Sequence, residues 1–157
     1  MLVLKNRIVR GWSPEDSPYS PIPEEEKEGV RNRLIPFIAS STPQIRNQLI
    51  PILTKILHFD FPTKWPNFLD VTLQLLNTNE ANSVFTGLLC LLTVCKVYRF
   101  KSTETRKDFD KVVALSFPQL LSIGTKLVEE TSNDAGEMLK MVMKSYKQAT
   151  YVSPQSS

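Results

Sequence analysis

Residues 43–65 read PQIRNQLIPILTKILHFDFPTKW. Apolar side chains recur through the first part of this stretch at steps of three and four residues, which is the spacing of one face of an α-helix. The apolar positions are Ile45, Leu49, Ile52, Leu53, Ile56 and Leu57. We therefore expect a helix from about Pro43 to Phe59 with a stripe broad enough to be covered on two sides. The prolines of the DFPTKW segment stop this helix and start another, so the chain should reverse direction there.

The same spacing recurs along most of the chain, whereas the alternation typical of strands is missing. The predicted helices cover about residues 2–12, 24–40, 43–59, 65–77, 80–99, 103–130 and 134–149. Residues 13–23 carry four prolines in eleven positions, which excludes a helix and predicts a loop. Pro23 and the glutamates after it suit the first turn of a helix, because carboxylates complement the positive end of the helix dipole.

Pairs of helices start near residues 24, 65 and 103, an interval of roughly 40 residues that is typical of HEAT or armadillo repeats. The period predicts an all-α fold, a HEAT/ARM-type α-solenoid in which antiparallel helix pairs form a right-handed superhelix. Its parts are a leading helix at 1–12, a Pro-rich loop at 13–23, three pairs at 24–59, 65–99 and 103–149, and a flexible tail at 150–157.

A closed helical bundle is the alternative architecture. The constant interval favours the solenoid, and so do Pro36 and Pro51, which lie inside predicted helices where bends can curve a stack of repeats. Pro118 should kink or divide the helix at 103–130.

Composition narrows the function. The chain has 157 residues, 41% of them hydrophobic, which is enough for a core. A charged share of 22% and a net charge of +3 favour neither disorder nor binding of a polyanion, so we expect no direct contact with nucleic acid. The apolar run from Val84 to Val97 is interrupted by polar residues, so no membrane insertion is expected. We expect a soluble intracellular chain in a reducing compartment.

The residues of catalysis are missing or isolated. His58 is the only histidine and has no second ligand at metal spacing, so an interior or interface position is expected for it. Cys90 and Cys95 lie on one apolar helix and suit small core residues rather than reactive thiols. The five glycines form no phosphate-binding loop. The sequence predicts a protein that is not an enzyme and uses no metal or cofactor.

Four segments, taken in order, resemble a known family. They are Leu4-Lys5-Asn6 ahead of Trp12, Ile22-Pro23-Glu24-Glu25, Ile45-Arg46-Asn47-Gln48-Leu49, and Asp60-Phe61-Pro62-Thr63-Lys64-Trp65. Together they resemble the amino-terminal region of the importin-β (karyopherin) family. The likeness is closest to the branch of importins seven and eight, and the yeast receptors similar to them, over about residues 3–127.

The resemblance implies a superhelix of outer and inner helices that carries cargo proteins through nuclear pores and releases them on binding the GTP form of the small GTPase Ran. It implies a location in nucleus and cytoplasm and at the nuclear pore, with nucleoporins as further partners. Because the family's receptors are several times longer, the chain is interpreted as a fragment, an alternative product or an incomplete gene model.

Ran contacts of the family come largely from inner helices of the first repeats. The resemblance therefore implies Ran-binding candidates at Lys5, Asn6 and Arg10 on one helix, and at Arg46 and Asn47 on another. Basic and amide groups suit an acidic protein surface that forms hydrogen bonds. The alternative is that these residues form only a solvated helical face.

Two further features have a functional and a structural interpretation. The turn with Asp60, Phe61, Pro62 and Trp65 could hold a nucleoporin phenylalanine, but aromatic residues at a tight turn more often lock two helices together, and we favour that role. The glutamates at 24–28 could meet basic cargo, such as ribosomal proteins or histones; a helix start rich in Glu explains them without cargo.

The leading hypothesis is an importin-type binding module that recognises protein surfaces. The second is a HEAT or armadillo scaffold, unrelated to transport, that assembles other subunits. A helical enzyme of the nuclease or deaminase kind is the least favoured.

Overall fold

The computed structural model describes residues 7–8, 10–12, 22–101, 103–130 and 132–152, and these form helices and turns without a strand. The all-α prediction is thus confirmed. The chain divides into two compact units, residues 1–66 and residues 67–157. The predicted helix at 2–12 lies partly outside the described residues; within it, residues 7–8 and 10–11 are helical.

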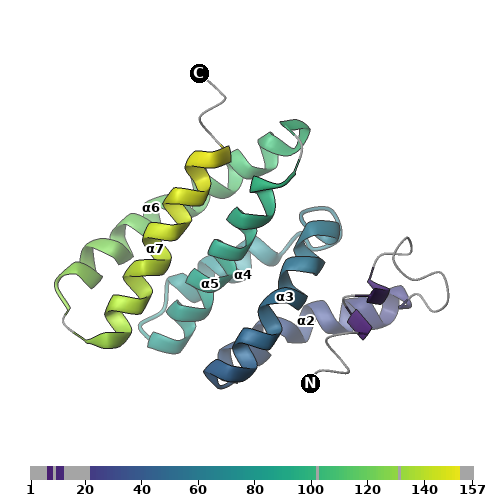
Figure 1. Cartoon of the computed structure of the whole chain (residues 1–157), viewed down its shortest axis with the longest axis horizontal. Helices are drawn as coiled ribbons and strands as arrows, with labels where there is room; N and C mark the ends of the chain where they lie inside the picture. The colour runs from purple at the N-terminus through teal and green to yellow at the C-terminus, as the bar shows by residue number, and fades with distance from the viewer. Residues whose placement is uncertain (1–6, 9, 13–21, 102, 131, 153–157) are drawn as a thin grey trace. The chain divides into compact units, whose positions relative to one another are not determined.

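Unit 1 is built around an antiparallel pair, helix α2 (Glu24–Ser40) and helix α3 (Pro43–Asp60) (Figure 1). Two hydroxyl groups define the tight turn between them. The Ser41 hydroxyl donates to the carbonyl of Ile38 over 2.9 Å, and the Thr42 hydroxyl accepts from the N–H of Ile45 over 3.4 Å. These hydroxyl groups end α2 and cap α3 between the predicted helices 24–40 and 43–59, because each satisfies a backbone group that the helix end leaves free.

The buried face of α2 differs from the predicted one. The apolar spacing of the sequence places Val30, Leu34, Phe37 and Ile38 on one face of α2, yet Phe37 is 43% exposed and Val30 is half-buried. The buried residues are Lys27, Arg31, Leu34, Ile35 and Ile38. Two charged side chains occupy positions of the core stripe because each finds a partner there, as described below.

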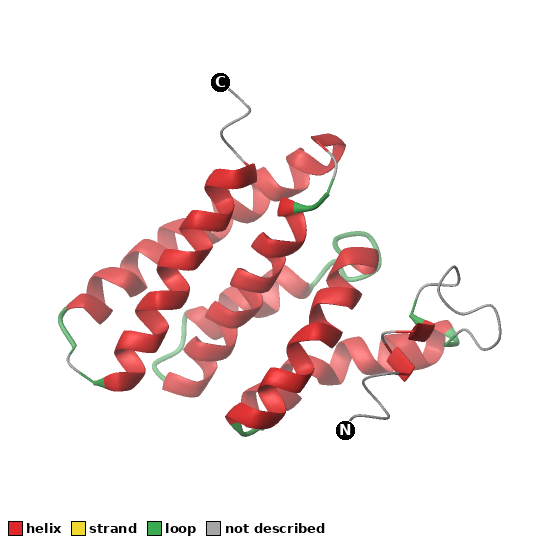
Figure 2. Cartoon of the chain, viewed as in Figure 1, coloured by secondary structure: helices red, strands yellow, loops and turns green. Residues whose placement is uncertain are grey.

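Unit 2 consists of two layers of helices. Helices α5 (Ala81–Arg99) and α7 (Asn133–Val152) lie side by side in one layer, and helices α4 (Phe68–Leu76) and α6 (Arg106–Val128) lie behind them (Figure 2). A short 3-10 turn, Thr103–Thr105, leads into α6. The helix predicted at 65–77 begins later, at Phe68, because the preceding residues form successive turns.

Helices α6 and α7 differ from expectation at Pro118, at Leu121 and at the carboxyl-terminal end of α7. Helix α6 runs through Pro118 without a break, so the expected division is wrong, whereas a kink at Pro118 stays a prediction. The apolar spacing of α6 includes Leu121 together with Phe109, Val112 and Leu120, yet Leu121 is 62% exposed whereas the other three residues are buried. Helix α7 continues to Val152, so the first three residues of the tail expected at 150–157 are helical; residues 153–157 lie outside the described part of the chain.

Helix α5 is the core of unit 2. Eleven of its residues are buried, among them Cys90 and Cys95. By length and composition it is the one helix among the described residues that could span a membrane, despite its polar interruptions. In this structure 61% of that window is buried inside the protein, which is how a core helix of a layered α protein behaves.

Gly87 lets α4 approach α5 closely. A Cβ atom at Gly87 would lie 2.9 Å from Leu76 Cδ2 and 3.2 Å from Leu75 Cβ, which is closer than van der Waals contact. At Gly136 on α7 a Cβ would meet nothing within 4 Å.

We predict that Gly87→Val lowers the free energy of unfolding by about 1–3 kcal/mol, because overpacking pushes α4 away from α5. The matched change Gly136→Val should leave it unchanged or raise it slightly, since glycine is the poorer helix former. Urea denaturation followed by circular dichroism measures both; equal losses would show that α4 and α5 are not packed at Gly87.

Candidate functional site

A buried carboxylate holds unit 1 together. Asp60, at the end of α3, is 2% exposed, and its Oδ2 accepts hydrogen bonds from Trp12 Nε1 over 3.0 Å and from Arg31 Nη1 over 2.7 Å. Arg31 also donates from Nη2 to Glu24 Oε1 over 2.6 Å. Lys27 Nζ lies 5.5 Å from the centre of the Trp12 ring. We call Trp12, Glu24, Lys27, Arg31 and Asp60 the Asp60 cluster.

The contacts of the cluster shift the pKa values of Arg31 and Glu24. Although burial acts to lower the pKa of Arg31, its hydrogen bonds to Glu24 and Asp60 outweigh burial and raise that pKa. The hydrogen bond from Arg31 lowers the pKa of Glu24 below its ordinary value of 4.5. The ion pair with Glu24 is therefore present above that ordinary value and is lost as the pH falls through the lowered pKa.

The backbone of Asp60 forms the turn that follows. Its carbonyl accepts from the N–H groups of Lys64, over 2.7 Å, and Trp65, over 3.1 Å. Phe61 and Trp65 are only 7% and 3% exposed. Since both rings are buried, the turn offers no open aromatic slot, and its geometry favours the interpretation that it locks helices together.

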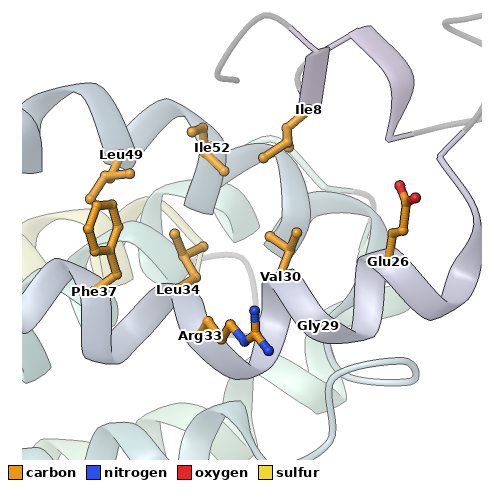
Figure 3. Close-up of a pocket in the computed structure, with 9 residues that line it drawn as sticks. All are labelled: Ile8, Glu26, Gly29, Val30, Arg33, Leu34, Phe37, Leu49 and Ile52. Carbon is orange, nitrogen blue, oxygen red and sulfur yellow. The ribbon is translucent and has the colours of Figure 1, made fainter. Parts of the chain in front are cut away.

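An apolar groove runs along α2 beside this cluster. It has a volume of about 520 Å³. Figure 3 shows its lining, which comes from the amino-terminal helical turn, α2 and α3: Ile8, Glu26, Gly29, Val30, Arg33, Leu34, Phe37, Leu49 and Ile52. Glu26 and Arg33 are the charged members and both are exposed. The groove suits apolar side chains, with one charge of each sign beside them.

The Ran-binding candidates differ in their surroundings. Arg10 and Asn47 are exposed on helical segments of unit 1. Arg46 is half-buried, and its Nη2 donates to the carbonyl of Ser41 over 3.2 Å, so it helps to close the α2–α3 turn. Lys5 and Asn6 lie outside the described residues.

The side chains considered for catalysis remain scattered. His58 is exposed on α3, with its ring edge-on to Phe59 at 4.8 Å, so of the two expected positions the interior one is wrong and the interface one stays a prediction. It lies outside the apolar stripe of α3, on the polar side of the helix. The described residues hold no group of three or more His, Cys, Asp or Glu able to bind a metal. Cys90 and Cys95 are buried, and burial raises the pKa of each thiol from 9.0 to about 12.

Sequence reasoning missed Arg31 and Trp12 as members of a buried cluster. A signal was present in the spacing, because Lys27 and Arg31 precede Leu34 and Ile38 at steps of four, three and four on one helical face. Asp60, which accepts hydrogen bonds from both Arg31 and Trp12, lies 29 residues from Arg31. A spacing pattern within one helix cannot reveal a partner that far away.

Two family models of known proteins match successive parts of this chain. The model of the family described as "Exportin 1-like protein" matches residues 42–153, and that of the "Importin-beta N-terminal domain" matches residues 1–40. No solved structure matches the chain.

Three curated relatives match along nearly the whole chain. "Nonsense-mediated mRNA decay protein 5" of Saccharomyces cerevisiae is 30% identical over 96% of this chain and 16% of its own length. "Importin beta-like SAD2 homolog" of Arabidopsis thaliana is 31% identical over 94% of the chain and 14% of its own length. "Probable importin-7 homolog" of Dictyostelium discoideum is 29% identical over 96% and 14%. The chain thus spans between 14% and 16% of the length of these relatives.

The Asp60 cluster makes a stability prediction. Asp60→Ala should lower the free energy of unfolding by about 3–5 kcal/mol, because it leaves the buried Nη1 of Arg31 and Nε1 of Trp12 without their acceptor. Glu24→Ala should cost about 1 kcal/mol or less, since Glu24 is exposed. Urea unfolding of both variants tests this, and a loss for Asp60→Ala as small as that for Glu24→Ala would contradict a buried, energetically coupled pair.

The two thiols make a second prediction. In the folded protein Cys90 and Cys95 should not react with an aromatic disulfide reagent near about pH 8, and should react at once after unfolding in urea. Stability should also fall as the pH rises from 9.0 toward about 12, because the unfolded thiols ionise first. Rapid reaction of the native protein would show that α5 is accessible.

Proposed function

Because the chain belongs to the importin-β family of nuclear transport receptors, we propose that it is the part of such a receptor that engages Ran in its GTP form and takes part in binding cargo proteins for nuclear import. The family match over residues 42–153 carries the assignment to the family. It also confirms the HEAT-type all-α fold, and, since the family consists of transport receptors, the prediction that the chain is not an enzyme.

Unit 1 supports a role in Ran binding through two exposed polar side chains. Arg10 and Asn47 are exposed, so both are available to a partner. A guanidinium offers paired donors to a carboxylate, and an amide adds a donor and an acceptor. Arg46 contributes less to such a surface, because it already bonds the Ser41 carbonyl. Lys5 and Asn6 stay candidates through the resemblance alone.

The acidic start of α2 supports a cargo of basic proteins. Glu25, Glu26 and Glu28 are exposed, while Glu24 is engaged with Arg31. Carboxylates on one helical turn attract a basic partner mainly by raising its association rate. Ribosomal proteins and histones are partners of this charge. Nucleoporins complete the proposed set of partners, and the proposed location is the nucleus, the cytoplasm and the nuclear pore. We do not propose the turn at Phe61 and Trp65 as the nucleoporin site, because both residues are buried.

A scaffold that assembles complexes without transport is the second function considered. It would bind partners by the same kind of helical surface, but it has no reason to distinguish the nucleotide state of a GTPase. That difference separates the two functions experimentally.

We predict that the chain retains Ran loaded with a GTP analogue and not Ran loaded with GDP, in a pull-down with purified proteins. Arg10→Glu combined with Asn47→Ala should weaken retention by about tenfold, as expected for loss of a charged and a polar contact. Lys111→Glu, an equally exposed charge reversal on α6, should not. Equal retention of both nucleotide states would reject the transport role for this chain.

A further inference from the structure

Basic side chains gather at one corner of unit 2. Helix α5 carries no acidic residue, and its cations Lys96 and Arg99 lie in its last turn. Helix α7 has its acids, Asp134 and Glu137, in its first turns, and its lysines follow from Lys140 onward. We call Lys96, Arg99, Lys140, Lys144 and Lys147 the basic corner.

The five cations lie on neighbouring helices of one layer. Helices α5 and α7 run side by side (Figure 1). Arg99 Nη1 donates to Gln148 Oε1 over 3.5 Å, so the carboxyl-terminal part of α5 adjoins that of α7. All five side chains are exposed. On α7 the lysines follow at steps of four and three residues, which places them on one face, while Val142, Ser145 and Ala149 face the core.

Two exposed apolar side chains accompany these charges. Met143 on α7 is 64% exposed, and Phe100 at the end of α5 is 77% exposed. The Arg99 guanidinium lies 5.4 Å from the centre of the Phe100 ring. Exposed apolar groups beside cations are a combination that binds mixed acidic and apolar segments, because the charges steer the partner and the apolar contacts hold it.

Helix stability explains only part of the corner. Cations in the last turn of a helix complement its dipole, which accounts for Lys96 and Arg99. Helix α7 has no basic residue in its last turn, so Lys140, Lys144 and Lys147 lie too far from its end for this effect. Lys140 forms an exposed pair with Glu137 over 3.4 Å. Neither that pair nor the dipole of α7 accounts for Lys144.

We propose that the basic corner is a docking surface for an acidic segment of another protein, in which Asp or Glu side chains meet the cations and one or two apolar side chains contact Met143 and Phe100. A nucleic acid fits less well. On α6 the acids Asp108 and Asp110 lie between the lysines Lys107 and Lys111, so the charge of this helix is mixed, and the whole chain has a net charge of only +3. The surface belongs to unit 2, whereas the described Ran-binding candidates belong to unit 1, and the proposal does not depend on Ran binding.

The test is a fluorescence anisotropy titration of the full chain with a short labelled peptide of Asp and Glu that carries two leucines. Lys96→Glu with Lys144→Glu should weaken binding by about tenfold or more, since two attractive charges become repulsive. The control Lys107→Glu with Lys111→Glu makes the same charge change on exposed positions of α6 and should alter binding by less than about twofold. Circular dichroism checks that both variants fold; should the reversal variant unfold, Lys96→Gln with Lys144→Gln replaces it.

Three outcomes would overturn the proposal. The first is equal weakening of binding by the two double variants. The second is a peptide with Gln and Asn in place of the acids that binds as tightly as the acidic one. The third is an RNA oligonucleotide that binds more tightly than the acidic peptide. Because the assay contains no Ran, its failure leaves the proposed transport function untouched, and failure of the Ran pull-down leaves this surface untouched.

Discussion

The carboxylate of Asp60 is the constraint on which unit 1 depends. It lies at 2% exposure and receives hydrogen bonds from Trp12 and Arg31, so it joins the amino-terminal helical turn, α2 and the end of α3. A buried charge without partners costs several kcal/mol, so these segments can vary their positions only together. The apolar groove is lined by the same elements, and its width follows from that arrangement.

Helices could be predicted closely from the sequence because their signals are local. Apolar spacing and the hydroxyl caps at Ser41 and Thr42 place α2 and α3 within a residue of the expected bounds. Burial was harder. Phe37 and Leu121 match the apolar spacing yet are exposed, and Arg31 interrupts it yet is buried. Which side of a helix is covered depends on neighbours distant in sequence, and spacing within one helix carries no information about them.

The candidate sites show the same division. The Ran-binding candidates rest on a family resemblance that fixes positions along the chain, and the structure then separates exposed Arg10 and Asn47 from half-buried Arg46. The basic corner could not have been found in this way. Lys96 and Lys144 are far apart in sequence and belong to one surface only because α5 and α7 pack side by side.

By length and composition helix α5 could span a membrane, but in this structure most of its apolar window is buried inside the protein. During synthesis it leaves the ribosome before α6 and α7 exist. Until those later helices are synthesised, a nascent chain ending near Arg99 exposes an apolar segment to solvent. Exposed apolar segments of this kind aggregate or bind chaperones. A cell that translates this region must therefore either protect the segment or complete the two following helices quickly.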